Sequence, residues 1–113
     1  MLFTSPSEFV NYVNKIKTGT PLTREQVKEF AIKLKQGDEK AREKLVDNYL
    51  PYLYSTIKKY STGEPSLELI YRAKIDLNEL IDSHNFLKEN DSFTRALSFK
   101  LRKTITKFIA DSW

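Results

Sequence analysis

The sequence TREQVKEFAIKLKQG, residues 23–37, encodes one complete helix and decides the fold class. Thr23 and Gln26 have the spacing of a capping box, in which each side chain accepts a hydrogen bond from the other residue's backbone N–H. The apolar side chains recur every three or four positions and form one stripe: Val27, Phe30, Ala31 and Leu34. Gly37 can end the helix, because glycine adopts the left-handed conformation without steric cost. The stretch therefore predicts an amphipathic helix whose two ends are both encoded.

Helical signals continue on either side of this stretch. Upstream, Ser5, Pro6 and Glu8 supply an N-cap, a first-turn proline and a third-position glutamate, and the helical pattern breaks at residues 18–21. Downstream, a new helix can begin at Asp38 and keeps its period to about Ile57. Pro51 lies within it, and because proline lacks a backbone donor we expect a kink or a restart there.

Two further helices are predicted in the second half of the chain. Residues 61–65 form a turn cluster, and the following apolar stripe is Leu69, Ile70, Ala73, Leu77, Leu80 and Ile81. This helix fades near His84, and Asp91 or Ser92 can cap the last one. The apolar stripe of the last helix is Leu97, Leu101, Ile105, Phe108 and Ile109. No strand signal competes, so the sequence predicts an all-α fold: a compact bundle of about five helices, forming a single domain over residues 1–113.

Composition excludes several classes of protein. The chain has no cysteine, so disulfides and thiolate metal sites are absent, and no apolar run approaches the roughly 20 residues that cross a bilayer. We therefore expect a soluble, cytoplasmic protein that does not use a membrane. His84 is the only histidine and lacks a nearby nucleophile, so it is expected to be a surface or capping residue. The acidic residues are dispersed and the three glycines are isolated. We expect no catalytic residue, metal, cofactor or small-molecule substrate, and hence no enzyme.

The positive charge is concentrated at one end of the sequence. Residues 1–92 contain equal numbers of basic and acidic side chains, so the net charge of +4 comes from the last twenty-one residues. Five basic residues fall between positions 93 and 109, and no acidic residue does. A helix with this pattern on an otherwise neutral body indicates a polyanionic partner.

Phe99 is an anomaly on this last helix. It falls on the polar face, near Arg95, Arg102, Lys103 and Thr106, where it cannot fill the core. An aromatic ring among cations suits stacking on an unpaired base while the cations neutralise phosphates. The alternative is a solvated lysine-rich face that carries one exposed ring.

The preceding helix has a similar anomaly. Tyr71, Ile75, Asn78 and Asp82 are spaced by four, three and four residues and form one row on its polar side. Tyr71 and Ile75 are therefore expected to be exposed and to anchor a partner protein. The alternative is that another part of this domain covers them.

The order of the motifs resembles one known family. KQGDEKAREKLV at 35–46, followed by NYL at 48–50 and IKKY at 57–60, resembles the start of region 2 of the sigma-seventy family of bacterial transcription initiation factors. Residues 12–13 and 21–25 are similar to the family's region 1.2, and ITKFIAD at 105–111 to the end of region 2.4. The resemblance covers about residues 8–111, with residues 1–35 like region 1.2 and 36–111 like region 2.

This resemblance implies a helical domain that binds the clamp helices of the RNA polymerase largest subunit and captures the opened promoter −10 element. The helix at 68–82 would contact polymerase or another regulatory protein. Its candidate residues are Glu68, Tyr71, Arg72, Lys74, Ile75, Asn78 and Asp82. The helix at 93–109 would contact single-stranded or melted DNA. Its candidate residues are Arg95, Phe99, Lys100, Arg102, Lys103, Thr106 and Lys107.

The departures from the family pattern are informative. Where the family usually reads Asp-Leu-Ile-Gln-Glu-Gly-Asn, this chain has ELIYRAK at 68–74, so acidic and amide contacts are replaced by aromatic and cationic ones. In the stretch that melts promoters, Ala96 replaces the tyrosine that stacks on the flipped base, and only Phe99 retains an aromatic at the tryptophan pair. Lys103 stands where glutamine is common, while Thr106 keeps the matching threonine. Phosphate contact is therefore expected, but autonomous base flipping is not.

Three functions follow as alternatives. The first is a sigma-like initiation domain, either one part of a split factor or a fragment of a longer one, since the family's later regions do not occur before Trp113. The second is a protein interaction module on a sigma fold that has lost promoter melting. The third is a general basic DNA-binding protein whose affinity follows charge and ignores sequence.

Overall fold

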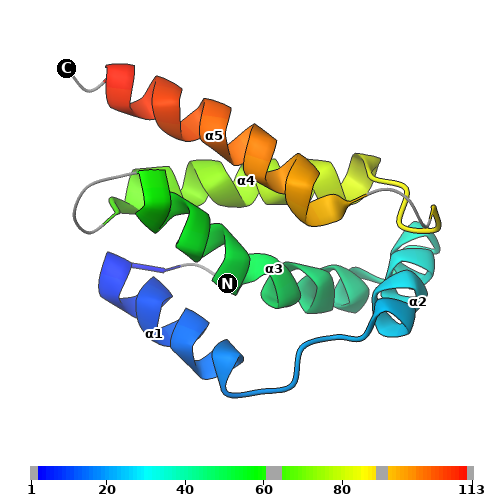
Figure 1. Cartoon of the computed structure of the whole chain (residues 1–113). Helices are drawn as coiled ribbons and strands as arrows, with labels where there is room; N and C mark the ends of the chain where they lie inside the picture. Colours follow the sequence, from blue (N-terminus) through cyan, green and yellow to red (C-terminus); the bar gives the residue numbers. More distant parts are fainter. Residues whose placement is uncertain (1–2, 61–64, 89–91, 112–113) are drawn as a thin grey trace.

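A computed structural model describes residues 3–60, 65–88 and 92–111 (Figure 1). Within these ranges the chain is all-helical and forms no strand, as the sequence predicts. The five helices are α1 (Pro6–Lys17), α2 (Arg24–Lys35), α3 (Glu39–Tyr60), α4 (Leu67–Ser83) and α5 (Phe93–Asp111). No helix in the described ranges is long and apolar enough to cross a membrane.

The ends of α2 are those that its sequence predicts. Thr23 Oγ1 accepts a hydrogen bond from the Gln26 N–H at 3.1 Å, and Gln26 Oε1 accepts one from the Thr23 N–H at 2.9 Å. At the other end Gly37 has a φ of 94°, and the Asp38 N–H donates to the Lys33 carbonyl at 3.0 Å. This backbone bond closes a Schellman motif, so local chemistry fixes both ends of the helix.

α3 remains a continuous helix through Pro51, so the predicted restart is wrong. The helix axis changes direction near its middle (Figure 1). This agrees with the predicted kink, because the proline ring crowds the preceding turn and removes one backbone donor.

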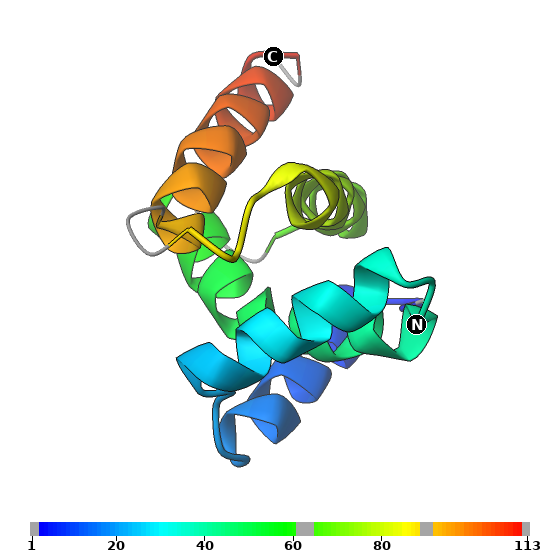
Figure 2. The same ribbon diagram turned by 90° about the vertical axis from the view of Figure 1, so that its right-hand side faces the viewer.

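α3 is the centre of the bundle and contacts each of the other four helices. α4 and α5 lie side by side, α1 lies at the opposite edge, and α2 packs at the end where α3 begins (Figures 1 and 2). The largest fully buried side chains come from four helices: Phe9 and Val13; Leu45, Leu50, Leu53 and Ile57; Ile70 and Leu77; Leu97, Leu101 and Ile105. These side chains bury one face of α4 and one face of α5. The opposite faces of the two helices are therefore available to contact a partner.

Candidate nucleic-acid and partner-binding surfaces

The outer face of α5 gathers most of the predicted DNA-binding residues. Ser92 caps the helix by accepting a hydrogen bond from the Arg95 N–H at 3.2 Å, while Asp91, the other predicted cap, lies outside the described residues. Leu97, Leu101 and Ile105 point into the core. The opposite side is exposed, and it carries Arg95, Phe99, Arg102, Lys103, Thr106 and Lys107. Five of these six, with Ala110, line a shallow open groove: Phe99, Arg102, Lys103, Thr106 and Lys107.

Phe99 is 62% exposed, which confirms the prediction that it lies outside the core. The Nζ of Lys103 lies 4.5 Å from the centroid of its ring, within range of a cation–π interaction. The ring and the cation therefore form a preassembled pair on the surface. Such a pair offers an apolar platform and a positive charge within a few ångströms of each other.

Lys100 differs from the other basic residues of α5. It is only partly exposed, and its Nζ lies 3.3 Å from Oε2 of Glu79 on α4. The pair is open to solvent, so it contributes little to stability, but it directs the lysine toward α4. Lys100 thus lies at the edge of the cationic face, and its DNA-binding role remains a prediction.

Tyr71 on α4 does not have the exposure that its spacing suggests. It is partly buried, and its hydroxyl accepts a hydrogen bond from the Phe3 N–H and donates one to the Phe3 carbonyl, both at 2.6 Å. Phe3 itself is buried and packs edge-on against Phe9 and Tyr12. The prediction of an exposed Tyr71 is therefore wrong, because the N-terminal segment folds back and covers it. Periodicity within α4 carries no information about a segment 68 residues away.

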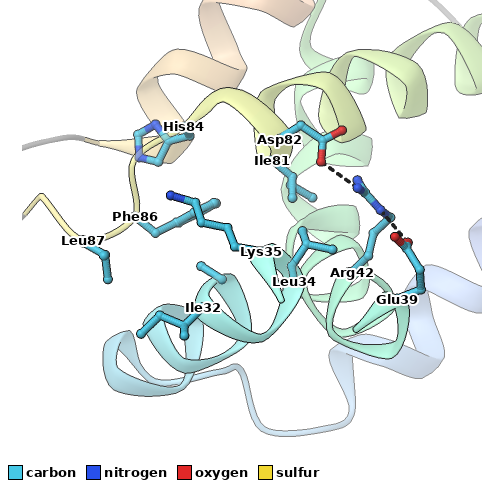
Figure 3. Close-up of a pocket in the computed structure, with 11 residues that line it drawn as sticks. Ile32, Leu34, Lys35, Glu39, Arg42, Ile81, Asp82, His84, Phe86 and Leu87 are labelled. Carbon is cyan, nitrogen blue, oxygen red and sulfur yellow. Dashed lines mark hydrogen bonds and ion pairs between the residues drawn. The ribbon is translucent and has the colours of Figure 1, made fainter. Parts of the chain in front are cut away.

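Asn78 and Asp82 are also engaged within the chain. Arg42 of α3 donates to Asn78 Oδ1 at 3.3 Å and to Asp82 Oδ1 at 2.6 Å, and its Nε donates to Glu39 Oε2 at 2.9 Å. Figure 3 shows the contacts of Arg42 with Asp82 and Glu39. This network joins α3 to α4. It also means that Asn78 and Asp82 would have to give up an internal contact to bind a partner with the same atoms.

Lys74 and Arg72 lie on opposite flanks of α4. Lys74 is half-buried with its Nζ 5.2 Å from the Phe3 ring centroid, and burial lowers the pKa of this amine. The Arg72 guanidinium lies 5.3 Å from the Phe108 ring of α5 and pairs with Glu68 at 3.0 Å. The two cations that distinguish this helix from the family pattern therefore both contact aromatic rings of neighbouring segments.

Ile75 is 57% exposed, which confirms that part of the prediction. It lies on an outward ridge of α4 whose exposed members are spaced by four, three, four and three residues: Glu68, Arg72, Ile75, Glu79 and Asp82. We call these five residues the α4 ridge. Glu79 was not among the predicted residues, although a helical row that begins at Glu68 rather than Tyr71 includes it. The ridge offers one apolar side chain among mainly acidic neighbours.

A pocket of about 130 Å³ lies between α2, the start of α3, the end of α4 and the segment after it (Figure 3). Its lining includes Leu34, Ile81 and Phe86, with Ile32 and Leu87 exposed. His84 also lines the pocket, and its backbone N–H caps α4 by donating to the Leu80 carbonyl at 2.8 Å. The prediction of His84 as a capping residue is confirmed. The pocket itself was not predicted, because four separate segments build it.

The geometry defines an all-helical protein with a cationic, aromatic face on one helix and a narrow ridge on its neighbour. In the described ranges no group of three or more histidine, aspartate or glutamate side chains is arranged to hold a metal ion. Neither any protein-family model nor any solved structure matches the chain. Among curated proteins, the RNA polymerase sigma factor SigA of Clostridium acetobutylicum is 30% identical to it over 101 residues.

The aligned part covers 88% of this chain and 26% of the SigA sequence, so the chain spans about a quarter of its relative's length. This is distant homology to a sigma factor, and it includes nearly all of the helical domain. The chain therefore has a distant relative that is named as an RNA polymerase sigma factor.

Proposed function

We propose that this chain is a sigma-like transcription factor domain of the sigma-seventy family, which binds promoter −10 DNA and the RNA polymerase core. In this proposal residues 1–113 form one domain, with residues 1–35 corresponding to region 1.2 and residues 36–111 to region 2. The domain works in the cytoplasm and is not an enzyme. The similarity to SigA supports the family, and the exposed face of α5 supports the DNA-binding role.

The pair of Phe99 and Lys103 is the observation that carries the proposal. Phe99 is open to solvent, and Arg102, Lys103 and Lys107 form no ion pair with a carboxylate in the described part of the chain. A base that stacks on an aromatic ring gains roughly 1–3 kcal/mol, and free cations beside the ring neutralise the adjoining phosphates. Because Ala96 offers no ring for a flipped base, we expect binding to a strand that is already open rather than active melting.

Contact with polymerase is assigned to the α4 ridge. Ile75 supplies an exposed apolar centre, and Glu68, Glu79 and Asp82 supply acidic neighbours. A partner helix with an apolar residue between basic ones complements this ridge. Tyr71 and Asn78 do not belong to this surface in the proposal, because they are only partly exposed, whereas the ridge residues are exposed.

The DNA-binding role is tested by fluorescence anisotropy with a forked −10 oligonucleotide at several salt concentrations. Phe99→Ala should weaken binding by about five- to a hundredfold through lost stacking. Lys103→Glu should weaken it further and reduce its dependence on salt. Lys17→Glu, an exposed change on α1 away from α5, is the matched control and should have a much smaller effect. Equal losses from Lys17→Glu and Lys103→Glu would favour the charge-driven, sequence-independent alternative.

The polymerase role is tested by pull-down with core RNA polymerase, using the chain alone and together with a polypeptide that carries the family's later regions. Ile75→Asp should abolish capture, because it introduces a charge at the apolar centre of the ridge. Phe99→Ala should leave capture intact. If the unmodified chain fails to bind polymerase in both settings, this part of the proposal is wrong.

A protein interaction module remains the second candidate function. It is favoured by the ELIYRAK sequence of α4, whose cations Arg72 and Lys74 contact the rings of Phe108 and Phe3. For this candidate, Ile75→Asp should disrupt a complex with a regulatory protein while the chain binds −10 DNA weakly and without preference for its sequence. Selective, Phe99-dependent binding of the −10 oligonucleotide would argue against it.

A further inference from the structure

The end of α3 brings a third aromatic and cationic element to the face that α5 presents. Tyr60 is the last residue of α3 and is 36% exposed. The guanidinium carbon of Arg102 lies 5.6 Å from the Tyr60 ring centroid, and the Nζ of Lys59 lies at the same distance. One ring thus holds two cations that come from two different helices.

The contact with Tyr60 restricts the orientation of the Arg102 guanidinium group. A guanidinium group is planar and stacks on aromatic rings, and when it does so its N–H donors remain at the edge of the stack. Those donors match the oxygens of a phosphate group as a two-pronged fork. Neither Arg102 nor Lys59 forms an ion pair with a carboxylate in the described ranges, so no carboxylate of those ranges competes for them.

Arg102 also lines the groove that contains Phe99, Lys103, Thr106 and Lys107. Phe99 and Arg102 are three residues apart on one helix, so their side chains are neighbours on its surface. A strand with a base on Phe99 therefore has its backbone within reach of Arg102. From there the positive surface continues past α5 onto Tyr60 and Lys59.

We propose that the nucleic-acid contact spans two helices: Arg102, held by the Tyr60 ring, and Lys59 bind backbone phosphates of the strand whose base stacks on Phe99. Tyr60 is a positioning residue that acts through Arg102. This inference rests on the proposed DNA-binding function, and it adds residues of α3 that the last helix alone would not indicate. The ligand class is a single-stranded nucleic-acid backbone, read by charge and geometry rather than by base identity.

The test uses the 113-residue chain and a fluorescein-labelled dT oligonucleotide, with binding constants measured over a range of salt concentrations. Lys59→Gln and Arg102→Gln should each reduce the slope of log K against log salt by about 0.7, the value for one phosphate contact on a single strand. Tyr60→Leu should weaken binding roughly two- to fivefold by releasing Arg102, and Tyr60→Phe should restore it because the ring is kept. Lys17→Gln on α1 is the control and should leave the slope unchanged.

A double-mutant cycle separates positioning from a general structural effect. Tyr60→Leu should have little further effect when Arg102 is already Gln, since the residue that it positions is gone. The proposal is overturned if Tyr60→Leu costs the same in both backgrounds, or if Lys59→Gln and Arg102→Gln leave the salt slope unchanged. If Phe99→Ala still weakens binding in that case, only the extension onto α3 is wrong. If Phe99→Ala also has no effect, the DNA-binding function itself is wrong.

Discussion

α4 and α5 carry the same kind of sequence signal but differ in what covers them. Each is amphipathic, and each has a large apolar or aromatic residue on its polar side. On α5 that residue, Phe99, stays open with Lys103 beside it. On α4 the hydroxyl of Tyr71 is bound to the backbone of Phe3, and Asp82 is bound to Arg42. A misplaced aromatic ring in a helical pattern therefore indicates either a binding surface or a contact with a distant segment of the same chain.

This difference separates the two surfaces energetically. Side chains on the outer face of α5 contribute little to the stability of the folded state. Substituting them should therefore change binding rather than stability. Polar side chains on the flank of α4 help to hold the N-terminal segment and α3 in place. Substitutions on the two helices should consequently affect different measurements.

The largest expected effect is that of Tyr71→Ala on stability. It removes a half-buried ring and both hydrogen bonds to Phe3, and we expect a loss of about 2–3 kcal/mol in the free energy of unfolding. Tyr71→Phe removes only the hydroxyl and should cost about 1–2 kcal/mol. Phe99→Ala, the matched change on α5, should stay within about 0.5 kcal/mol of the parent. Urea unfolding followed by circular dichroism measures all three, and equal costs for Tyr71→Ala and Phe99→Ala would remove the contrast between the helices.

Arg42→Ala should have a smaller effect of the same kind. Arg42 contacts Asn78, Asp82 and Glu39, but its carboxylate partners are exposed, so we expect a loss of about 1 kcal/mol. Lys44→Ala is the control, because Lys44 is an exposed cation of the same helix without an ion pair in the described ranges. Asp82→Ala should cost less in the Arg42→Ala background than in the parent. An undiminished cost there would mean that the pair between α3 and α4 does not contribute.

Most of the fold could be predicted because its signals are local. The capping box of Thr23, the left-handed Gly37 and the cap at Ser92 each depend on residues within a few positions. The apolar stripes gave the buried faces for the same reason, except at Ile109, which is 36% exposed. At Pro51 a local rule predicts a kink or a restart without deciding between them, and α3 continues through the proline.

The site could be predicted only in part. A helical wheel identifies Phe99 and Ile75 as exposed, because nothing in the described structure covers either residue extensively. It fails for Tyr71, which Phe3 covers, and for the pocket beside His84, which four segments build. Tyr60 was missed because its partner Arg102 lies on another helix. The failures share one cause: each contact joins positions far apart in the sequence.

The smallest expected effect is a pH dependence at the contact between Asp76 of α4 and Thr104 of α5, which we call the seam. Asp76 of α4 is half-buried, and its carboxylate accepts a short hydrogen bond from the Thr104 hydroxyl of α5. Burial raises the pKa of Asp76 above its ordinary value of 3.8, and the bond from Thr104 and the charge of Lys100 partly oppose that rise. The folded state therefore binds this proton more tightly than the unfolded state does.

The sign of the pH effect follows from that difference. Stability from Asp76 is fully present below pH 3.8 and is lost as the pH rises through the raised pKa. Asp76→Asn does not titrate, so the parent should lose stability relative to Asp76→Asn as the pH rises above 3.8 toward neutrality. Thr104→Val removes a bond that favours the charged carboxylate and should make the loss larger. Urea unfolding midpoints at a series of pH values measure this loss of stability. Parallel pH profiles for the parent and Asp76→Asn would contradict the prediction and show that the charged Asp76 carboxylate does not destabilise the seam. Phe99→Ala, outside the seam, should follow the profile of the parent, because the exposed face of α5 and its buried seam with α4 act independently.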